Sequence, residues 1–263
     1  MHVIIRVCVI ALLLLTLLAR SRRKPTIDQP DVYCLMVTLN DPRRQEYIRQ
    51  SVRNFREQTY VNKRLVIMNQ SESGERILAS KEDLADDRML EVMLPRGNLG
   101  EIRNISLEMV PLGAIWTLWD DDDWRAPDYL ETLEKTMREN DADFLMIRNR
   151  IEYVVPTKFA YVATLRSGFM SFFARKTPRP LRYAHLDRLE DKPLKIEARR
   201  TRAVYVLDNP PTMYVRFVHD TNTSPYVNNK RASVRDTSRN SDYFEREIHA
   251  REHESLRKIL SNY

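Results

Sequence analysis

Four consecutive aspartates, residues 120–123, directly follow a strongly apolar run, GAIWTLW over residues 113–119. This pattern predicts a buried strand with an acidic carboxyl end, which is where open α/β sheets bind ligands. Adjacent carboxylates repel one another unless a cation neutralises them, and a divalent metal would also leave coordination positions for phosphate oxygens. The alternative is an acidic cap on a helix that begins near Pro127, which would use only part of the cluster.

Strand and helix patterns alternate along the first half of the chain. Strands are expected at residues 32–38, 65–68, 89–94 and 113–119, and helices at residues 43–58, 75–84, 100–109 and 127–138. This alternation predicts an α/β domain with a mainly parallel sheet flanked by helices. Residues 143–174 are rich in β-branched and aromatic residues, so we expect additional antiparallel strands there, and residues 241–263 have the spacing of a final helix.

The N-terminal segment is apolar over residues 3–19, apart from Arg6, and predicts a single membrane anchor. A cleavable signal peptide would need its basic charge before the apolar stretch, and an interfacial helix is a further alternative. The basic residues 20–24 follow the apolar segment, so the positive-inside rule places the domain in the cytoplasm. The alternative location is the lumen of the secretory pathway.

The chain divides into an anchor with a basic flank (1–24), a linker (25–31), a main domain (32–227) and a C-terminal tail with a helix (228–263).

Composition excludes several classes of protein. The formal net charge is +6, but five basic residues and no acid lie in residues 1–24, so the remainder is nearly neutral and a nucleic-acid partner is not expected. Cys8 lies in the apolar segment, so Cys34 has no partner for a disulfide within the domain. The chain has only five glycines, and their spacing fits neither the dinucleotide G-x-G-x-x-G pattern nor a P-loop.

Five segments, taken together and in this order, resemble family 2 glycosyltransferases. They are VYCLMVTLNDPRR (32–44), RGNLGEIRNISLE (96–108), IWTLWDDDDWRAPDYLE (115–131), LEDKPLK (189–195) and PPTMYVRFVHDTNTS (210–224). The resemblance implies a GT-A, Rossmann-like fold. It also implies transfer of a sugar from a nucleotide-diphosphate donor to a hydroxyl of a glycan, lipid or protein, with Mn²⁺ or Mg²⁺ and with inversion at the anomeric carbon.

The same resemblance assigns roles at the metal and at the reacting bond. Asp122 becomes the metal ligand that holds the diphosphate, and His219 a further ligand, although a lone histidine is more often a packed polar residue. Asp191 becomes the general base that deprotonates the acceptor hydroxyl. Without the resemblance, Asp191 would be interpreted as a salt-bridging carboxylate at the start of a helix.

The remaining assignments concern the two substrates. The residues that the resemblance places at the donor are Thr38, Asn40, Asn69, Arg103, Asp120 and Asp121. Gly100 would let the backbone approach the nucleotide. Asn69 begins an Asn-Gln-Ser sequence where the family usually has acidic residues, which leaves the nucleobase open. On the acceptor side we place Glu190 and Trp124, whose ring would form an apolar wall for a sugar, whereas Trp116 and Trp119 are expected in the core.

Three other interpretations compete with a glycosyltransferase. His249, Glu252 and His253 form an H-x-x-E-H pattern found in zinc peptidases, but they lie in a polar segment at the end of the sequence. A nucleotidyltransferase would use a similar aspartate cluster with a more basic triphosphate loop. A module that binds a sugar or nucleotide without turnover would keep the fold but not need both Asp122 and Asp191.

Overall fold

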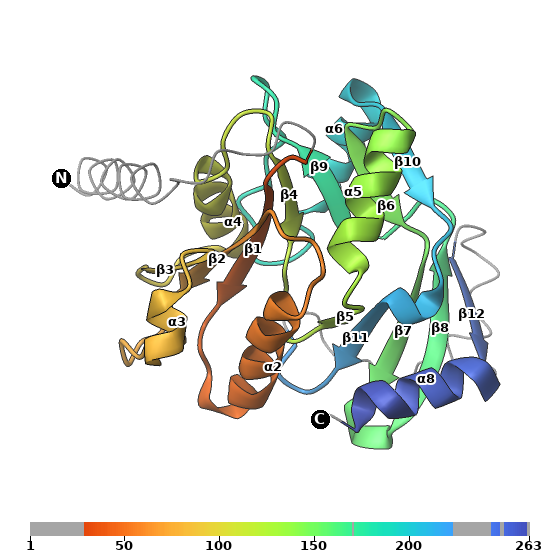
Figure 1. Ribbon diagram of the computed structural model, residues 1–263, viewed down its shortest axis with the longest axis horizontal. Coiled ribbons are helices and arrows are strands. Elements are labelled where there is room, and N and C mark those ends of the chain that lie inside the picture. Colours follow the sequence, from red (N-terminus) through yellow and green to blue (C-terminus); the bar gives the residue numbers. More distant parts are fainter. Residues whose placement is uncertain (1–28, 170, 223–242, 248–249, 262–263) are drawn as a thin grey trace.

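The computed structural model describes residues 29–169, 171–222, 243–247 and 250–261 (Figure 1). The predicted anchor, residues 1–24, lies outside the described residues. Among the helices that are described, none is both long enough and apolar enough to cross a membrane.

The larger of two sheets has seven strands in the order β10-β6-β9-β4-β1-β2-β3. Its strands are β1 (Val32–Thr38), β2 (Lys63–Asn69), β3 (Met89–Met93), β4 (Ile115–Leu118), β6 (Phe144–Ile147), β9 (Phe172–Arg175) and β10 (Val204–Leu207). Neighbouring strands are parallel except where β9 pairs with β4 and β6. This confirms the predicted mixed, mainly parallel sheet.

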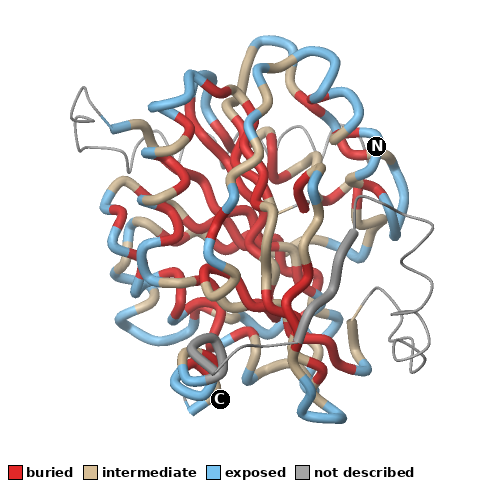
Figure 2. Tube along the Cα trace, turned by 90° about the vertical axis from the view of Figure 1, so that its right-hand side faces the viewer, coloured by how far each residue is buried: buried red, intermediate tan, exposed pale blue. Residues whose placement is uncertain are grey.

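Helices cover both faces of this sheet, which is why its strands are apolar on both sides. Buried segments fill the middle of the molecule, and exposed ones lie at its periphery (Figure 2). Cys34 and Met36 of β1 point to one face, while Tyr33 and Leu35 point to the other. The first face packs against α2 (Gln45–Arg56) and α5 (Tyr129–Glu139), and the second against α4 (Leu99–Glu108) and α6 (Lys192–Thr201). As predicted, Trp116 and Trp119 are buried in these two layers.

The second sheet has five strands in the order β12-β8-β7-β11-β5. Its strands are β5 (Trp124–Arg125), β7 (Asn149–Val154), β8 (Phe159–Leu165), β11 (Tyr214–Val218) and β12 (Tyr243–Glu247). Leu256 and Ile259 of α8 (Ala250–Leu260) pack against Val215 and Phe217 on one face of this sheet. The short 3-10 helices are η1 (Pro42–Arg44), η2 (Val155–Thr157) and η3 (Pro211–Met213).

The helix predicted over residues 75–84 is wrong for most of its length. Only α3 (Lys81–Ala85) is helical. Glu91 accepts hydrogen bonds from the amides of Ile77 and Leu78 at 2.9 and 3.0 Å, and two side-chain amides hold the carbonyl of Glu75. Because side chains bind this backbone, it forms a loop instead of a helix.

The helix predicted over residues 241–263 begins later than expected. Its first part forms β12, which pairs antiparallel with β8 in the register Tyr243↔Leu165, and only α8 is helical. Pairing with an open sheet edge thus overrides the local helical pattern.

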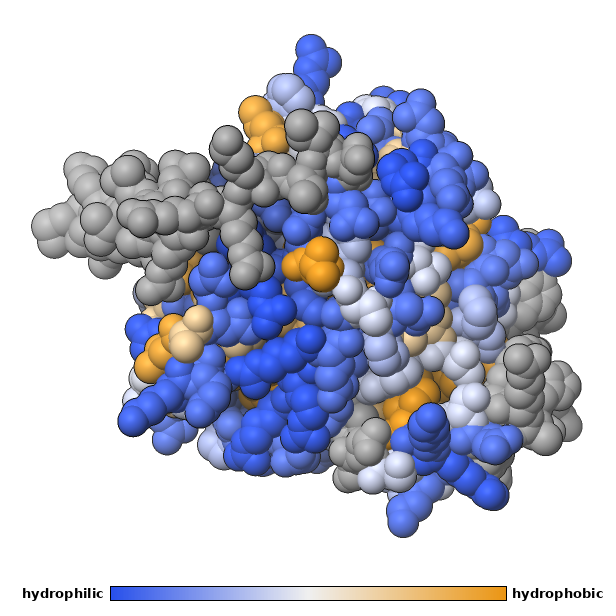
Figure 3. Space-filling view, in the orientation of Figure 1, coloured by the Kyte–Doolittle hydropathy of each residue, from blue (hydrophilic) through white to orange (hydrophobic). Residues whose placement is uncertain are grey.

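The surface of the domain is largely hydrophilic on the face shown in Figure 3. Exposed large apolar residues occur singly in the sequence, as at Val61, Leu84, Leu112 and Leu189. Single exposed apolar residues are ordinary in globular proteins.

Candidate active site

A cavity of about 440 Å³ opens where β1 and β4 end. Its wall includes residues after both strands, the start of α4, the loop before α6 and part of β11. The predicted site residues that line it are Thr38, Arg103, Asp120, Asp121, Asp122, Glu190 and Asp191. The aspartate cluster and the LEDKPLK segment therefore face the same space, at the edge of the sheet where α/β domains bind ligands.

Asp122 is held by a dense set of polar contacts. Its Oδ2 accepts hydrogen bonds from Arg44 Nη2 at 2.7 Å and Asn222 Nδ2 at 2.8 Å, and lies 3.2 Å from His219 Nε2. Burial alone would raise the pKa of Asp122, but the hydrogen bond with His219 and the charge of Arg44 outweigh burial and lower this pKa. Asp122 is thus held as a carboxylate inside the protein.

His219 is both packed and directed at the acidic cluster. Its ring stacks on Tyr47 with centroids 4.6 Å apart, and its Nδ1 lies 2.8 Å from the hydroxyl of Thr221. These contacts fix the ring so that Nε2 faces Asp122. The sequence left open a ligand or a packed polar residue, and the geometry fits both descriptions.

The other three aspartates differ in their partners. Asp123 accepts hydrogen bonds from the Tyr214 hydroxyl and from the backbone amide of Phe217, which ties the end of β4 to β11. Asp121 pairs with Arg44, and Asp120 pairs with Arg103 at 3.2 Å. Burial raises the pKa of both Asp121 and Asp123 to about 7.

The donor atoms near Asp122 decide whether a metal fits. No group of three or more His, Cys, Asp or Glu residues within the described ranges could hold an ion, and His249 of the H-x-x-E-H pattern lies outside them. Asp122 and His219 nevertheless offer one carboxylate and one imidazole nitrogen side by side. Mg²⁺ commonly binds through one or two protein carboxylates, with phosphates and water completing its shell. The pair therefore fits a metal whose coordination the substrate completes.

The loop before α6 is held in place by the start of α4. The amide of Gly100 donates to the carbonyl of Leu186 at 3.0 Å, and the amide of Leu99 donates to the carboxylate of Asp187 at 3.0 Å. A Cβ atom at position 100 would overlap the carbonyl oxygen of Ala184. Gly100 thus admits this loop close to the helix, whereas the sequence suggested that it admits the nucleotide.

Arg103 links the two acidic segments across the cavity. It forms an ion pair with Glu190 and another with Asp120 at 3.2 Å, and its side chain is 12% exposed. Asp191 follows as the residue before α6, and its side chain does not cap that helix. Burial raises the pKa of Asp191 above its ordinary value, while the charge of Arg103 opposes this shift. Burial also raises the pKa of Glu190.

Three of the polar residues predicted at the donor have different surroundings. Thr38 lines the cavity, and its hydroxyl accepts the amide of Asn40 at 3.0 Å. Asn40 and Asn69 both donate to the carbonyl of Glu75, at 2.9 and 2.8 Å, and neither lines the cavity. Gln70 lines it instead, and accepts the amide of Gly97 at 2.7 Å. The two asparagines therefore brace the neighbouring loop.

Trp124 lies in β5 and packs with the cluster between the second sheet and α8. It is not among the residues that line the cavity, whereas Glu190 is. The contact of Trp124 with an acceptor sugar stays a prediction.

Several residues that line the cavity did not emerge from the sequence. They are Arg44, Gln70, Arg150, Arg216 and Asn222. Arg44 belongs to the quoted VYCLMVTLNDPRR segment, and Asn222 follows His219 by three positions. The sequence could therefore have singled them out by their place in these segments. Their contacts with the aspartates were not available, because 78 and 100 residues separate Arg44 and Asn222 from Asp122.

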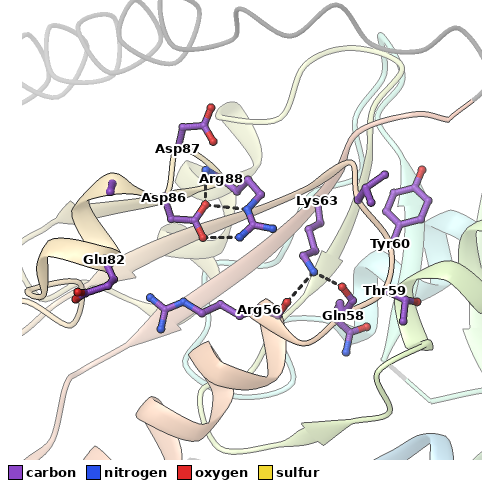
Figure 4. A pocket seen from close by; sticks show the side chains of 11 residues that line it. Arg56, Gln58, Thr59, Tyr60, Lys63, Glu82, Asp86, Asp87 and Arg88 are labelled. Carbon is purple, nitrogen blue, oxygen red and sulfur yellow. Dashed lines mark hydrogen bonds and ion pairs between the residues drawn. The ribbon is translucent and has the colours of Figure 1, made fainter.

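A second cavity, of about 560 Å³, lies between the end of α2, β2 and the loop after α3 (Figure 4). Two of its cations, Lys63 and Arg88, already have partners in the same region. Arg88 pairs with Asp86 at 2.7 Å, and Lys63 donates to the carbonyls of Arg56, at 3.0 Å, and Gln58. Because Lys63 binds carbonyls near the C-terminus of α2, we interpret this group as a helix cap. None of the predicted site residues lines this cavity.

The fold and the cavity together define a GT-A-like domain with an acidic ligand site. The family model of glycosyl transferase family 2 matches residues 33–190. The chain belongs to this family. A search of curated proteins finds no match.

Solved structures of S. aureus TarS are similar in fold. TarS 1–349 in complex with UDP has a TM-score of 0.58 and 16% identity, over 72% of this chain and 61% of that chain. The complex with UDP-GlcNAc has a TM-score of 0.60 and 16% identity, over 88% and 72%. A further TarS structure has a TM-score of 0.56 and 15% identity, over 88% and 43%. The chain thus spans less than two thirds of the TarS chain in the first of these matches.

Proposed function

We propose that this domain transfers a sugar from a nucleotide-diphosphate donor to a hydroxyl group of a glycan, lipid or protein, with inversion at the anomeric carbon. One observation carries the proposal. A single cavity contains Asp122, a carboxylate held in its charged form, and Asp191, a partly buried carboxylate that does not cap its helix. A group that holds a cation and a group that accepts a proton are the two that such a displacement needs.

The donor nucleoside would lie near the end of β1. Thr38 and Gln70 offer hydrogen-bonding groups there, and Asp120 and Asp121, which line the same cavity, are proposed at the donor as well. Asn40 and Asn69 would act indirectly by holding the adjacent loop. Uridine is the first base to test, because the TarS complexes contain UDP and UDP-GlcNAc.

The diphosphate would be held by a metal at Asp122 and His219, with Mn²⁺ or Mg²⁺ as the ion. The metal supplies positive charge for the departing nucleoside diphosphate. Arg103 would add positive charge near the departing diphosphate or keep Glu190 in place, since it contacts both Glu190 and Asp120.

Asp191 would take the proton of the acceptor hydroxyl. The acceptor oxygen then forms a bond to the anomeric carbon, the bond from that carbon to the diphosphate oxygen breaks, and the nucleoside diphosphate leaves. Glu190 and Trp124 are proposed on the acceptor side, and Glu190 is the one of the two that lines the cavity. No covalent enzyme intermediate is required.

We also propose that residues 3–19 attach the enzyme to a membrane with the domain in the cytoplasm. The basic residues 20–24 between the apolar segment and the domain support this orientation. Protease digestion of sealed vesicles would test it. Protection of the domain would place it in the lumen of the vesicle and reject the cytoplasmic assignment.

Binding and turnover of nucleotide sugars test the catalytic proposal. The full chain in detergent would be titrated with UDP, GDP and dTDP, with and without Mn²⁺, and incubated with the corresponding sugar donors to detect nucleoside diphosphate release. Binding of one nucleotide that depends on Mn²⁺, together with turnover, supports the proposal. Binding without turnover would favour a silent binding module, and metal-independent turnover would reject the metal.

A further inference from the structure

Arg44 is one of the residues of the cavity whose role the proposed reaction leaves open. It ends η1, in the connection between β1 and α2, and its side chain reaches the end of β4. Its Nη2 forms ion pairs with Asp121 and with Asp122, the latter at 2.7 Å. The side chain is only 13% exposed. Arg44 is therefore a mostly buried cation placed on the two carboxylates that follow Asp120.

The guanidinium of Arg44 is only partly satisfied by these contacts. Its Nε is buried and has no hydrogen-bond partner in the described part of the chain. A guanidinium carries five N–H donors, and an unpaired buried donor is costly. Nε is thus an unused donor, which a movement of the Arg44 side chain would make available to an acceptor such as a phosphate oxygen.

Arg44 also occupies the oxygen that a metal would use. Oδ2 of Asp122 accepts from Arg44 and Asn222 and faces Nε2 of His219. A metal ion bound between Asp122 and His219 needs this oxygen or the space beside it. A metal ion and a guanidinium that contact the same oxygen of Asp122 would repel each other, so they cannot both stay there.

We propose that Arg44 is a counter-cation that exchanges with the divalent metal. In the nucleotide-free enzyme it neutralises Asp121 and Asp122. When the metal binds together with the nucleotide, Arg44 leaves Asp122 and donates to the diphosphate. This inference rests on the proposed function, and it makes metal and nucleotide binding cooperative.

Calorimetric titration of Mn²⁺ into the full chain, with and without UDP, tests this exchange. The wild type should bind Mn²⁺ weakly alone and more tightly with UDP. Arg44→Gln should bind Mn²⁺ alone roughly 10-fold more tightly, because the competitor is gone. The gain from UDP should fall by about the same factor, because UDP no longer draws a competing cation away from Asp122.

Two further variants separate charge from folding effects. Arg44→Lys keeps a cation and should retain weak binding of Mn²⁺ alone. Arg49→Gln removes an exposed arginine of α2 that pairs with Glu46 at 3.3 Å, and should match the wild type. Thermal unfolding of each variant would verify that it is folded.

The outcomes distinguish this inference from the proposed function. If UDP promotes Mn²⁺ binding equally in the wild type and in Arg44→Gln, the exchange is wrong and the metal site stands. If neither protein binds Mn²⁺ even with UDP, the metal site is wrong and the exchange fails with it.

Discussion

Asp122 and Asp191 are carboxylates of one cavity with opposite surroundings. Asp122 follows a central strand and is contacted by an arginine, an asparagine and a histidine. Asp191 precedes α6, and its side chain does not cap the helix. Asp122 is buried and Asp191 is partly buried, yet the pKa of Asp122 is lowered and that of Asp191 is raised.

The difference shows how burial can serve two kinds of chemistry. Burial disfavours the charged form of a carboxylate, and donors or cations nearby reverse this effect. At Asp122 the neighbouring donors and the charge of Arg44 lower the pKa despite burial, so the group is suited to hold positive charge. At Asp191 burial prevails, so the group is suited to exchange a proton. The following predictions test whether the two carboxylates are really divided in this way.

The largest effect is expected for Asp122→Asn, which keeps the shape of the side chain and removes its charge. Donor binding that depends on Mn²⁺ should be lost, and transfer should fall roughly 1,000-fold, because several kcal/mol of charge stabilisation disappear. Calorimetry with UDP and a transfer assay would measure both. Asp128→Asn, at an exposed position before α5, is the matched control. Retention of metal-dependent binding in Asp122→Asn would remove Asp122 from the metal site.

A loss confined to transfer is expected for Asp191→Asn. The rate should fall roughly 100-fold or more, as for loss of a general base, while the Kd for the donor changes less than about twofold. Glu197→Gln, at an exposed position of α6, controls for loss of negative charge on the same helix. A near-normal rate in Asp191→Asn would contradict its assignment as the base. An equal loss of donor binding would mean that Asp191 and Asp122 act as one site.

A smaller effect, on stability, is expected for Gly100→Ala. The added methyl group would overlap the carbonyl oxygen of Ala184 and displace the loop that leads to Asp191. Overpacking of this kind costs about 1–3 kcal/mol of unfolding free energy, which denaturant titration can measure. Gly97→Ala is the comparison, because its Cβ would meet the end of the Ile102 side chain at 3.1 Å, and that end can move. Equal stability of the two variants would show that the loop is not held as closely as the structure indicates.

The region around Asp122 was more predictable than the region around Asp191. The strand before Asp120 is a continuous apolar run, and both faces of β4 are buried, so its place in the sheet follows from hydrophobicity. Four adjacent carboxylates after it carry a chemical signal of their own. Asp191 has no such signal, and only the resemblance of LEDKPLK to a family motif singled it out.

The remaining errors arise where tertiary contacts override local pattern. Residues 75–84 have helical spacing, but buried Glu91 binds the amides of Ile77 and Leu78. Asn69 ends β2, near the expected place, yet its side-chain amide donates to the carbonyl of Glu75 and to the carboxylate of Glu91. Contacts between residues far apart in the sequence, such as that of Arg44 with Asp122, cannot be inferred from spacing in a single sequence.

The smallest expected effect concerns pH and the neighbours of Asp191. A general base must be ionised, so transfer should fall as the pH drops through the pKa of Asp191, which burial raises above its ordinary value of 3.8. The charged groups that act on it are Arg103, Asp120 and Lys195, and Arg103 lowers its pKa. Arg103→Gln should therefore move the acid limb of the kcat/KM profile to higher pH, whereas Arg103→Lys should keep it nearer its wild-type position. If the acid limb does not move in Arg103→Gln, a group other than Asp191 controls it, and the division of roles between the two carboxylates would have to be revised.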